Sequence, residues 1–199
     1  MSKIVRVKLD EFLDDATVRY AVKHVRESQL QFHGNVRCEH FRSGVLLSGG
    51  WEPSSNTFTT EGMARLLNIV FRAQTTESAI YVGIFKGNVT PAIGDTAAVK
   101  LGGGSPYYEC LDADYDSPAT NKPAYTMAST STAVATNTAS KATFVMNASI
   151  TVYGAFLSTV AAKTATTGTL FCAKAFASPR AVIEDDELAI TYQITCTTS

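Results

Sequence analysis

Residues 188–196 read Leu-Ala-Ile-Thr-Tyr-Gln-Ile-Thr-Cys, a strict alternation in which every second side chain is large and apolar or a cysteine. A period of two is that of a β-strand, whose successive side chains point to opposite faces of a sheet. The apolar positions predict a face buried in a core: Leu188, Ile190, Tyr192, Ile194 and Cys196. The positions between them predict an exposed Thr/Gln face. The stretch therefore indicates a half-buried strand of an antiparallel sheet.

Similar strands are predicted upstream, at residues 142–146, 150–157 and 169–176, with turns at 160–168 and 178–180. Short strands with regular turn signals are typical of a sandwich of two antiparallel sheets. Two irregular segments, residues 87–106 and 129–140, interrupt them. We therefore expect residues 87–199 to be all-β.

A helix and a strand are predicted just before this region. Thr59 or Thr60 can cap a helix that has Glu61 in its first turn. Its apolar residues are expected on one face: Met63, Leu66, Leu67 and Val70. Residues 79–85, Ala-Ile-Tyr-Val-Gly-Ile-Phe, are apolar at successive positions, which predicts a central strand buried on both faces.

The first 50 residues have a different pattern. Between residues 10 and 27 the apolar side chains Leu13, Val18, Val22 and Val25, with Ala21, recur at spacings near three and four, which predicts an amphipathic helix. Residues 29–41 alternate poorly and predict an extended arm or a short strand pair. Ser48-Gly49-Gly50 then breaks the chain. We expect a helix and arm over residues 1–50 and a β-sandwich over 51–199. The predicted class is mainly β, an antiparallel sandwich with one packed helix and an N-terminal helix-plus-arm.

The amino-acid composition limits the classes of protein to which the chain can belong. The chain has 199 residues, 45% of them hydrophobic, and 17 basic against 18 acidic side chains. The hydrophobic content excludes a disordered chain. The balance of charges argues against a nucleic-acid binder that relies on a broad basic face. Charged residues make up 18%, below the ~25% usual for soluble proteins. Such a surface suits a protein covered by neighbours in an assembly. No apolar run of about 18–20 residues predicts a membrane span, and the N-terminus does not resemble a signal peptide, so cytoplasmic synthesis with reduced cysteines is expected.

Candidate metal and phosphate sites fail on spacing. Cys38-Glu39-His40 with His33 lacks the paired, closely spaced ligands of a zinc site. Asp112, Asp114 and Asp116 alternate as in a calcium loop, but Ser117 and Pro123 occupy the positions where an EF-hand has Gly and Glu. Gly102-Gly103-Gly104 is not followed by the Lys-Ser/Thr of a phosphate-binding loop. No metal and no cofactor are predicted, and a loose calcium site at the aspartates is the weaker alternative.

The sequence does not contain a recognisable set of catalytic residues either. No Gly-x-Ser-x-Gly occurs, and all three histidines precede residue 41. No set of residues fills the nucleophile, base and stabiliser roles together, so we predict no catalytic residues and no enzyme activity.

Two consecutive motifs carry a family resemblance. Residues 56–68 read Asn-Thr-Phe-Thr-Thr-Glu-Gly-Met-Ala-Arg-Leu-Leu-Asn, and residues 80–85 read Ile-Tyr-Val-Gly-Ile-Phe. This order resembles a family of small structural proteins of tailed bacteriophages, in which a T-x-E-G-x-x-x-L-L helix leads to a W/Y-V-G-L-F strand. Further matches follow at Pro91, 95–98, 122–125, 150–157, 168–170 and 186–192, where Asp186 and Leu188 match a D-x-L motif. The resemblance covers residues 50–199.

The resemblance implies a non-enzymatic virion component, most readily a collar or neck protein at the head-to-tail junction, or a capsid decoration protein. Its expected partners are the portal, a head-tail connector or the capsid, and copies of itself in a homo-oligomer. No membrane and no specific nucleic acid are expected as partners. The alternative is a tail-fibre-associated or host-receptor-binding module, for which exposed aromatics would be required: Trp51, Tyr107, Tyr108, Tyr115 and Tyr125. An enzyme acting on the host envelope ranks third.

The N-terminal region suggests where attachment could occur. Its basic start and modest apolar stripe predict a partner-binding arm, and the residues concerned are Lys3, Arg6, Lys8, Leu13, Val18, Val22 and Val25. Glycines at 44, 49 and 50 favour a flexible connection between the arm and the sandwich over an arm held in a fixed position on it. The arm is therefore expected to bind another virion subunit, with a helix folded onto its own sandwich as the alternative.

Overall fold

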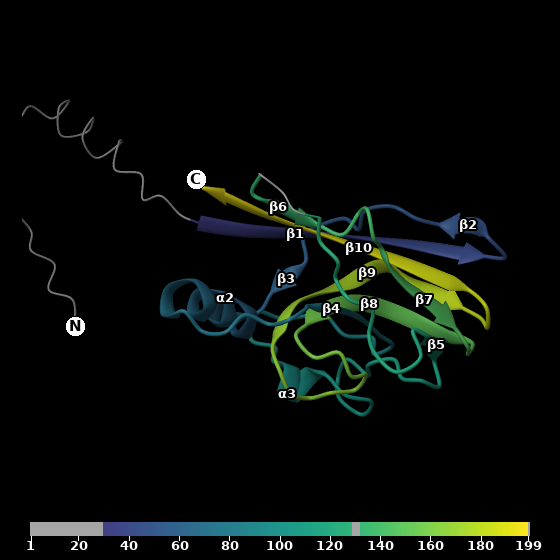
Figure 1. The fold of residues 1–199 in the computed structure, drawn as a ribbon. Coiled ribbons are helices and arrows are strands. Elements are labelled where there is room, and N and C mark those ends of the chain that lie inside the picture. Colours follow the sequence, from purple (N-terminus) through teal and green to yellow (C-terminus); the bar gives the residue numbers. More distant parts are fainter. Residues whose placement is uncertain (1–29, 129–131, 199) are drawn as a thin grey trace, which may run out of the picture. The chain divides into compact units, whose positions relative to one another are not determined.

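The computed structural model describes residues 30–128 and 132–198 (Figure 1). Two antiparallel sheets dominate these residues, as the sequence predicts. One sheet has the order β2-β1-β10-β7-β5, with β6 also pairing with β10, and the other has the order β3-β9-β8-β4. The strands are β1 Leu30–Arg42, β2 Val45–Ser48, β3 Thr57–Phe58, β4 Tyr81–Phe85, β5 Tyr115–Ser117, β6 Val134–Thr136, β7 Ala142–Met146, β8 Ile150–Ser158, β9 Leu170–Val182 and β10 Glu187–Thr198. The helices are α2 Thr60–Arg72 and α3 Ala97–Lys100.

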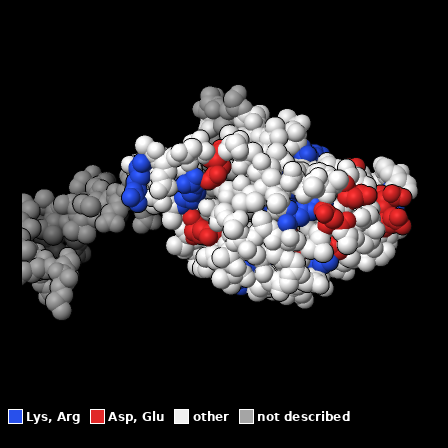
Figure 2. Space-filling model, turned by 60° about the horizontal axis from the view of Figure 1, so that its bottom comes forward, with Lys and Arg blue, Asp and Glu red and all other residues white. Residues whose placement is uncertain are grey.

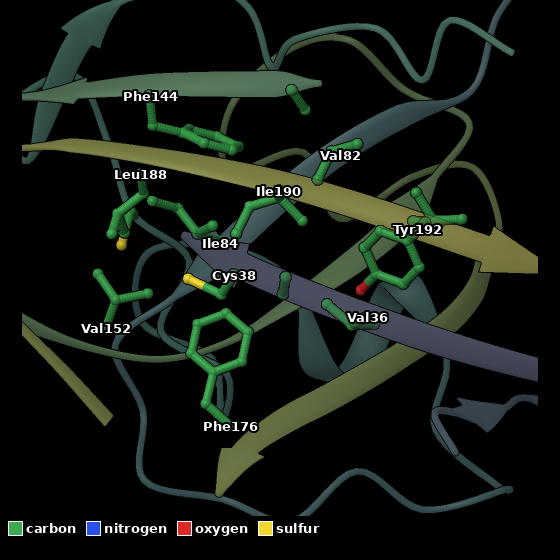
Figure 3. Close-up of a cluster of buried hydrophobic side chains, with 14 of the residues drawn as sticks. Val36, Cys38, Val82, Ile84, Phe144, Val152, Phe176, Leu188, Ile190 and Tyr192 are labelled. Atoms are coloured by element: carbon green, nitrogen blue, oxygen red, sulfur yellow. The ribbon is translucent and has the colours of Figure 1, made fainter. Parts of the chain in front are cut away.

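The main core lies between the two sheets (Figure 3). Leu188, Ile190 and Tyr192 of β10 are fully buried there, which confirms the predicted face at these three positions, whereas Ile194 and Cys196 are half-buried. The three buried side chains meet side chains of the other sheet, among them Val82 and Ile84 of β4. The opposite face of β10 is not the exposed face that we expected. Ala189 and Thr191 retain only 4% and 1% exposure, so this strand is buried on both sides from residue 188 to residue 192.

A second apolar cluster covers the outer face of the four-stranded sheet, formed by Phe85, Ala97, Leu101, Tyr107, Phe156, Leu170 and Ala173. Two cross-strand pairs build its floor, because Gly83 lies opposite Phe156 and Phe85 lies opposite Gly154. A Cβ atom at Gly83 would lie 2.1 Å from the Phe156 ring, so the aromatic side chains occupy the space above the glycines. Cores on both faces explain why residues 79–85 are apolar throughout.

β4 is an edge strand, and the prediction of a central strand is wrong in this respect. Its outer edge is covered by residues 107–125, which we call the covering segment. The amide of Val82 donates to the Pro123 carbonyl (2.9 Å), and that of Cys110 donates to the Ile84 carbonyl (3.0 Å). Backbone groups toward both ends of this edge are thereby paired without a regular neighbouring strand.

Buried charges hold the covering segment in place. Lys122 Nζ lies 3.0 Å from Glu109 Oε1, and both side chains are at most 1% exposed. Lys122 also donates to the Ala162 carbonyl and lies over the Phe156 ring. Burial lowers the pKa of Lys122 and raises that of Glu109, against the attraction between the two groups. This pair fixes the segment only while both partners are present.

α2 begins as predicted, with Thr59 as its N-cap and the Thr59 hydroxyl accepting from the Gly62 amide at 2.9 Å. A Cβ atom at Gly62 would come within 2.6 Å of the Phe171 backbone, so glycine permits the helix to lie directly on β9. The predicted buried face is only partly right. Leu66 packs against the core, but Leu67 and Val70 point outward, with 51% and 69% exposure.

The boundary between arm and sandwich lies earlier than expected. β1 is a full member of the six-stranded sheet, and its Val36 and Cys38 belong to the main core. Residues 32–50 are therefore part of the sandwich, and assigning them to a separate arm is wrong. The predicted helix at 10–27 lies outside the described residues. β9 also runs through 178–180, where a turn was expected.

Candidate interaction surfaces

The hairpin of β1 and β2 carries an apolar surface on an open sheet edge. Val45, Leu46 and Leu47 are 63%, 50% and 50% exposed, and we call them the hairpin surface. β2 is the terminal strand of its sheet, so one edge of its backbone lacks a neighbouring strand among the described residues. Such an edge can accept another chain. These residues are absent from the surfaces predicted above, although a run of apolar side chains between Ser43-Gly44 and Ser48-Gly49 is a signal that could have indicated them.

Local geometry makes this hairpin well defined. Arg42 pairs with Val45, and the two turn residues between them, Ser43 and Gly44, have φ values of 49° and 75°. Positive φ at both positions is typical of the two-residue turn whose twist matches that of the strands.

A buried carboxylate anchors the base of the hairpin. Asp186 accepts two hydrogen bonds from Arg42, from Nε and from Nη2, each at 2.8 Å, and its Oδ2 lies 2.8 Å from His40 Nε2. The bonds from Arg42 above all hold the pKa of Asp186 well below its usual range. Asp186 lies in the turn between β9 and β10, so the hairpin and this turn form one end of the sandwich.

The same end is acidic. Glu184 and Asp185 of the β9–β10 turn are exposed, and neither makes an ion pair within the described ranges. Figure 2 shows acidic side chains gathering toward the right-hand end of the molecule.

An apolar groove of about 380 Å³ opens at the other end of the sandwich, and we call it the end groove. It lies where β1 and β9 begin and β10 nears its end. It is lined by Phe32, Phe58, Leu66, Glu77, Ala79, Ile80, Tyr125, Met127, Ala135, Leu157, Phe171 and Ile194. Met127 is 48% exposed at this groove. The lining is apolar apart from Glu77, which pairs with Arg65 of α2.

The outward face of α2 is also apolar. Leu67, Val70 and Phe71 are 51%, 69% and 79% exposed, while Gly62 and Leu66 of the same helix face the sandwich. A helix with apolar residues on both sides is normally covered on both sides. Within residues 30–128 and 132–198 nothing covers the outer side of α2, which is typical of a contact surface.

A polar hollow of about 270 Å³ adjoins the hairpin, between residues 48–53 and 177–180. Trp51, 46% exposed, lines it together with Arg180, whose Nη2 lies 2.7 Å from Glu52 Oε1. Of the aromatics considered for glycan binding, Trp51 and Tyr108 are exposed, whereas Tyr107 and Tyr115 are buried. Tyr125 is half-buried in the end groove.

The candidate metal ligands take separate roles. Cys38 lies in the core, and burial raises the pKa of its thiol to about 12. His40 binds Asp186, and Glu39 pairs with Arg37 and Lys141. His33 is exposed. Within residues 30–128 and 132–198, no three His, Cys, Asp or Glu side chains gather in an arrangement that could hold a metal ion.

The three aspartates are likewise dispersed. Asp114 pairs with Lys86 at 2.7 Å, Asp112 pairs with Lys163 at 2.8 Å, and Asp116 is exposed. Asp114 and Asp112 therefore serve as structural partners of two different lysines.

The predicted arm residues lie outside the described part of the chain: Lys3, Arg6, Lys8, Leu13, Val18, Val22 and Val25. Within the described part, no helix has the length and apolar character needed to cross a membrane.

Comparisons of the chain with protein-family models, with curated proteins and with solved structures give no significant match.

Proposed function

We propose that this chain is a non-enzymatic structural component of a tailed-phage virion, a collar or neck protein at the head-to-tail junction or a capsid decoration protein. The observation that carries the proposal is the exposure of large apolar side chains on the hairpin surface and on the outer face of α2. Grouped exposed apolar residues are typical of protein interfaces. The low share of charged residues, 18%, fits a subunit covered by neighbours.

The motif order from residue 56 to residue 192 supports the virion assignment, because it resembles that of small phage structural proteins. The portal, a head-tail connector or the capsid would supply the partner surfaces. The part of the chain before residue 30, with its basic start, is a further candidate for attachment.

Immunogold labelling of intact particles with an antibody against this chain tests the proposal. We expect label at the head-to-tail junction or over the capsid. Label confined to fibre tips, or particles without the chain by mass spectrometry, would overturn it.

The second candidate function is host-receptor binding through a glycan, which the polar hollow favours. Trp51 offers an exposed ring beside the Glu52–Arg180 pair, and such a combination can stack on a sugar ring and hydrogen-bond its hydroxyls. Trp51 is the chain's single tryptophan, so its fluorescence reports directly on this hollow. Quenching or a spectral shift on titration with host-surface oligosaccharides, together with calorimetric binding that is lost in Trp51→Ala, would favour this function over the first.

A further inference from the structure

We propose that copies of this chain associate head to tail, with the hairpin surface of one copy seated in the end groove of the next. This inference rests on the proposed role as an assembly subunit and names its partner, a second copy. It requires no particular position in the virion.

The two surfaces lie at opposite ends of the same sheet. Phe32 near the start of β1 lines the end groove, and Arg42 at the end of β1 adjoins the hairpin turn. Ten residues of strand separate them, about 33 Å at the usual rise. Figure 1 shows β2 at one end and α2 and β6 at the other. A contact between two different surfaces of identical chains is heterologous, and it builds rings or filaments.

The two surfaces are complementary in form and polarity. The hairpin surface projects three aliphatic side chains from a narrow two-stranded ribbon. The end groove is a hollow with an almost wholly apolar lining. Seating one in the other removes both from water, which is the main source of favourable free energy in association. A hairpin-to-hairpin contact would leave the groove exposed.

Charge also favours the head-to-tail arrangement. Glu184 and Asp185 lie exposed at the hairpin end and make no ion pair with the residues that the structure describes. At the groove end, Arg65 of α2 is neutralised by its pair with Glu77, whereas Arg72 of the same helix makes no ion pair in the described part of the chain. Opposite ends therefore attract, whereas two hairpin ends would bring acidic turns together.

Two variants test the contact from each side. Leu46→Asp places a charge on the hairpin surface, and Met127→Asp places one at the end groove. Both positions are about half-exposed, at 50% and 48%, so both chains should fold, as circular dichroism can verify. Val99→Asp is the matched control, because Val99 is 60% exposed on α3 and belongs to neither surface.

Sedimentation of the full-length chain gives the readout. The wild-type mass should rise with concentration, and Val99→Asp should behave in the same way. Each of the other variants should stay monomeric alone. Their equimolar mixture should form a 1:1 dimer, because the intact groove of Leu46→Asp can receive the intact hairpin of Met127→Asp.

Three results would overturn the inference: a monomeric wild type at about 1 mM, where even weak contacts are populated; association of Met127→Asp equal to wild type; or a mixture that remains monomeric. If any of these occurs while immunogold labelling still places the chain at the junction or capsid, the proposed function stands and only the head-to-tail contact fails.

Discussion

β4 and β2 are both edge strands, but the outer edge of β4 is covered by another segment and that of β2 is open among the described residues. The outer edge of β4 is closed by the covering segment, whose backbone hydrogen-bonds to it at both ends. β2 has no such cover among the described residues, and three of its four side chains are large, aliphatic and exposed. Natural proteins usually protect an edge with charges, bulges or a covering loop. An edge left apolar and open, beside one so fully closed, indicates a surface reserved for a neighbour.

The interactions that fix the covering segment also differ from those that fix the hairpin. The buried Lys122–Glu109 pair joins two parts of the covering segment, and Lys86, directly after β4, pairs with Asp114 of that segment. The hairpin depends instead on a turn and on one anchored arginine at its base. Changes near β4 should therefore affect folding, and changes at β2 should affect association. The following predictions test this division.

The largest effect is expected for Lys122→Met. Removing the ammonium leaves Glu109 buried without its partner, which typically costs about 3–5 kcal/mol. Urea denaturation should show this loss. Lys174→Met is the control, because the hydrogen bonds of Lys174 to the Pro53 carbonyl and the Ser54 hydroxyl are exposed, and a loss of about 1 kcal/mol or less is expected. Equal losses in both variants would mean that the covering segment is not held by the buried pair.

Matched truncations compare the edges directly. Ile84→Ala removes a side chain that is 1% exposed in the core and should cost about 2–5 kcal/mol of unfolding free energy. Leu46→Ala, at 50% exposure, should change the stability of the monomer by no more than about 0.5 kcal/mol. A large loss at Leu46 in dilute, monomeric protein would show that the hairpin surface is needed for the fold itself.

A smaller, pH-dependent effect is expected at the base of the hairpin. The pKa of Asp186 is lowered in the folded protein, so its contribution is complete above the unfolded value of about 3.9. That contribution is lost as the pH falls from there toward the folded value. Thermal melts between about pH 5 and pH 2 should show falling stability. In Asp186→Asn this part of the pH dependence should be weaker, and an unchanged profile would contradict the proposed anchoring.

Much of the sandwich could be predicted because its strands carry local signals. The alternation of residues 188–196 and the Thr59 cap are readable without any long-range information, and both are confirmed. β1 was harder to predict. Val36, Cys38 and His40 lie on the same face of this strand, which is buried. The partner of His40 is Asp186, which is 146 positions away along the chain. Such pairing depends on tertiary contacts that no local pattern contains.

The interaction surfaces could not be predicted from local sequence patterns either. Leu66 and Leu67 are adjacent and both apolar, and only the packing of Gly62 on β9 decides which one faces the sandwich. Residues 111–116 look like a solvated acidic loop in the sequence, because the lysines that pair with Asp112 and Asp114 come from other parts of the chain.

Hydrogen–deuterium exchange at low and high protein concentration tests the central claim most directly, because it reports on both edges in one sample. Amides of β4 should be protected at every concentration. Amides of residues 45–48 should exchange rapidly in dilute protein and become protected as concentration rises, together with segments that line the end groove, and Leu46→Asp should abolish that change. If residues 45–48 exchange at the same rate at all concentrations, or gain protection without the groove segments, the open edge is not the assembly surface proposed.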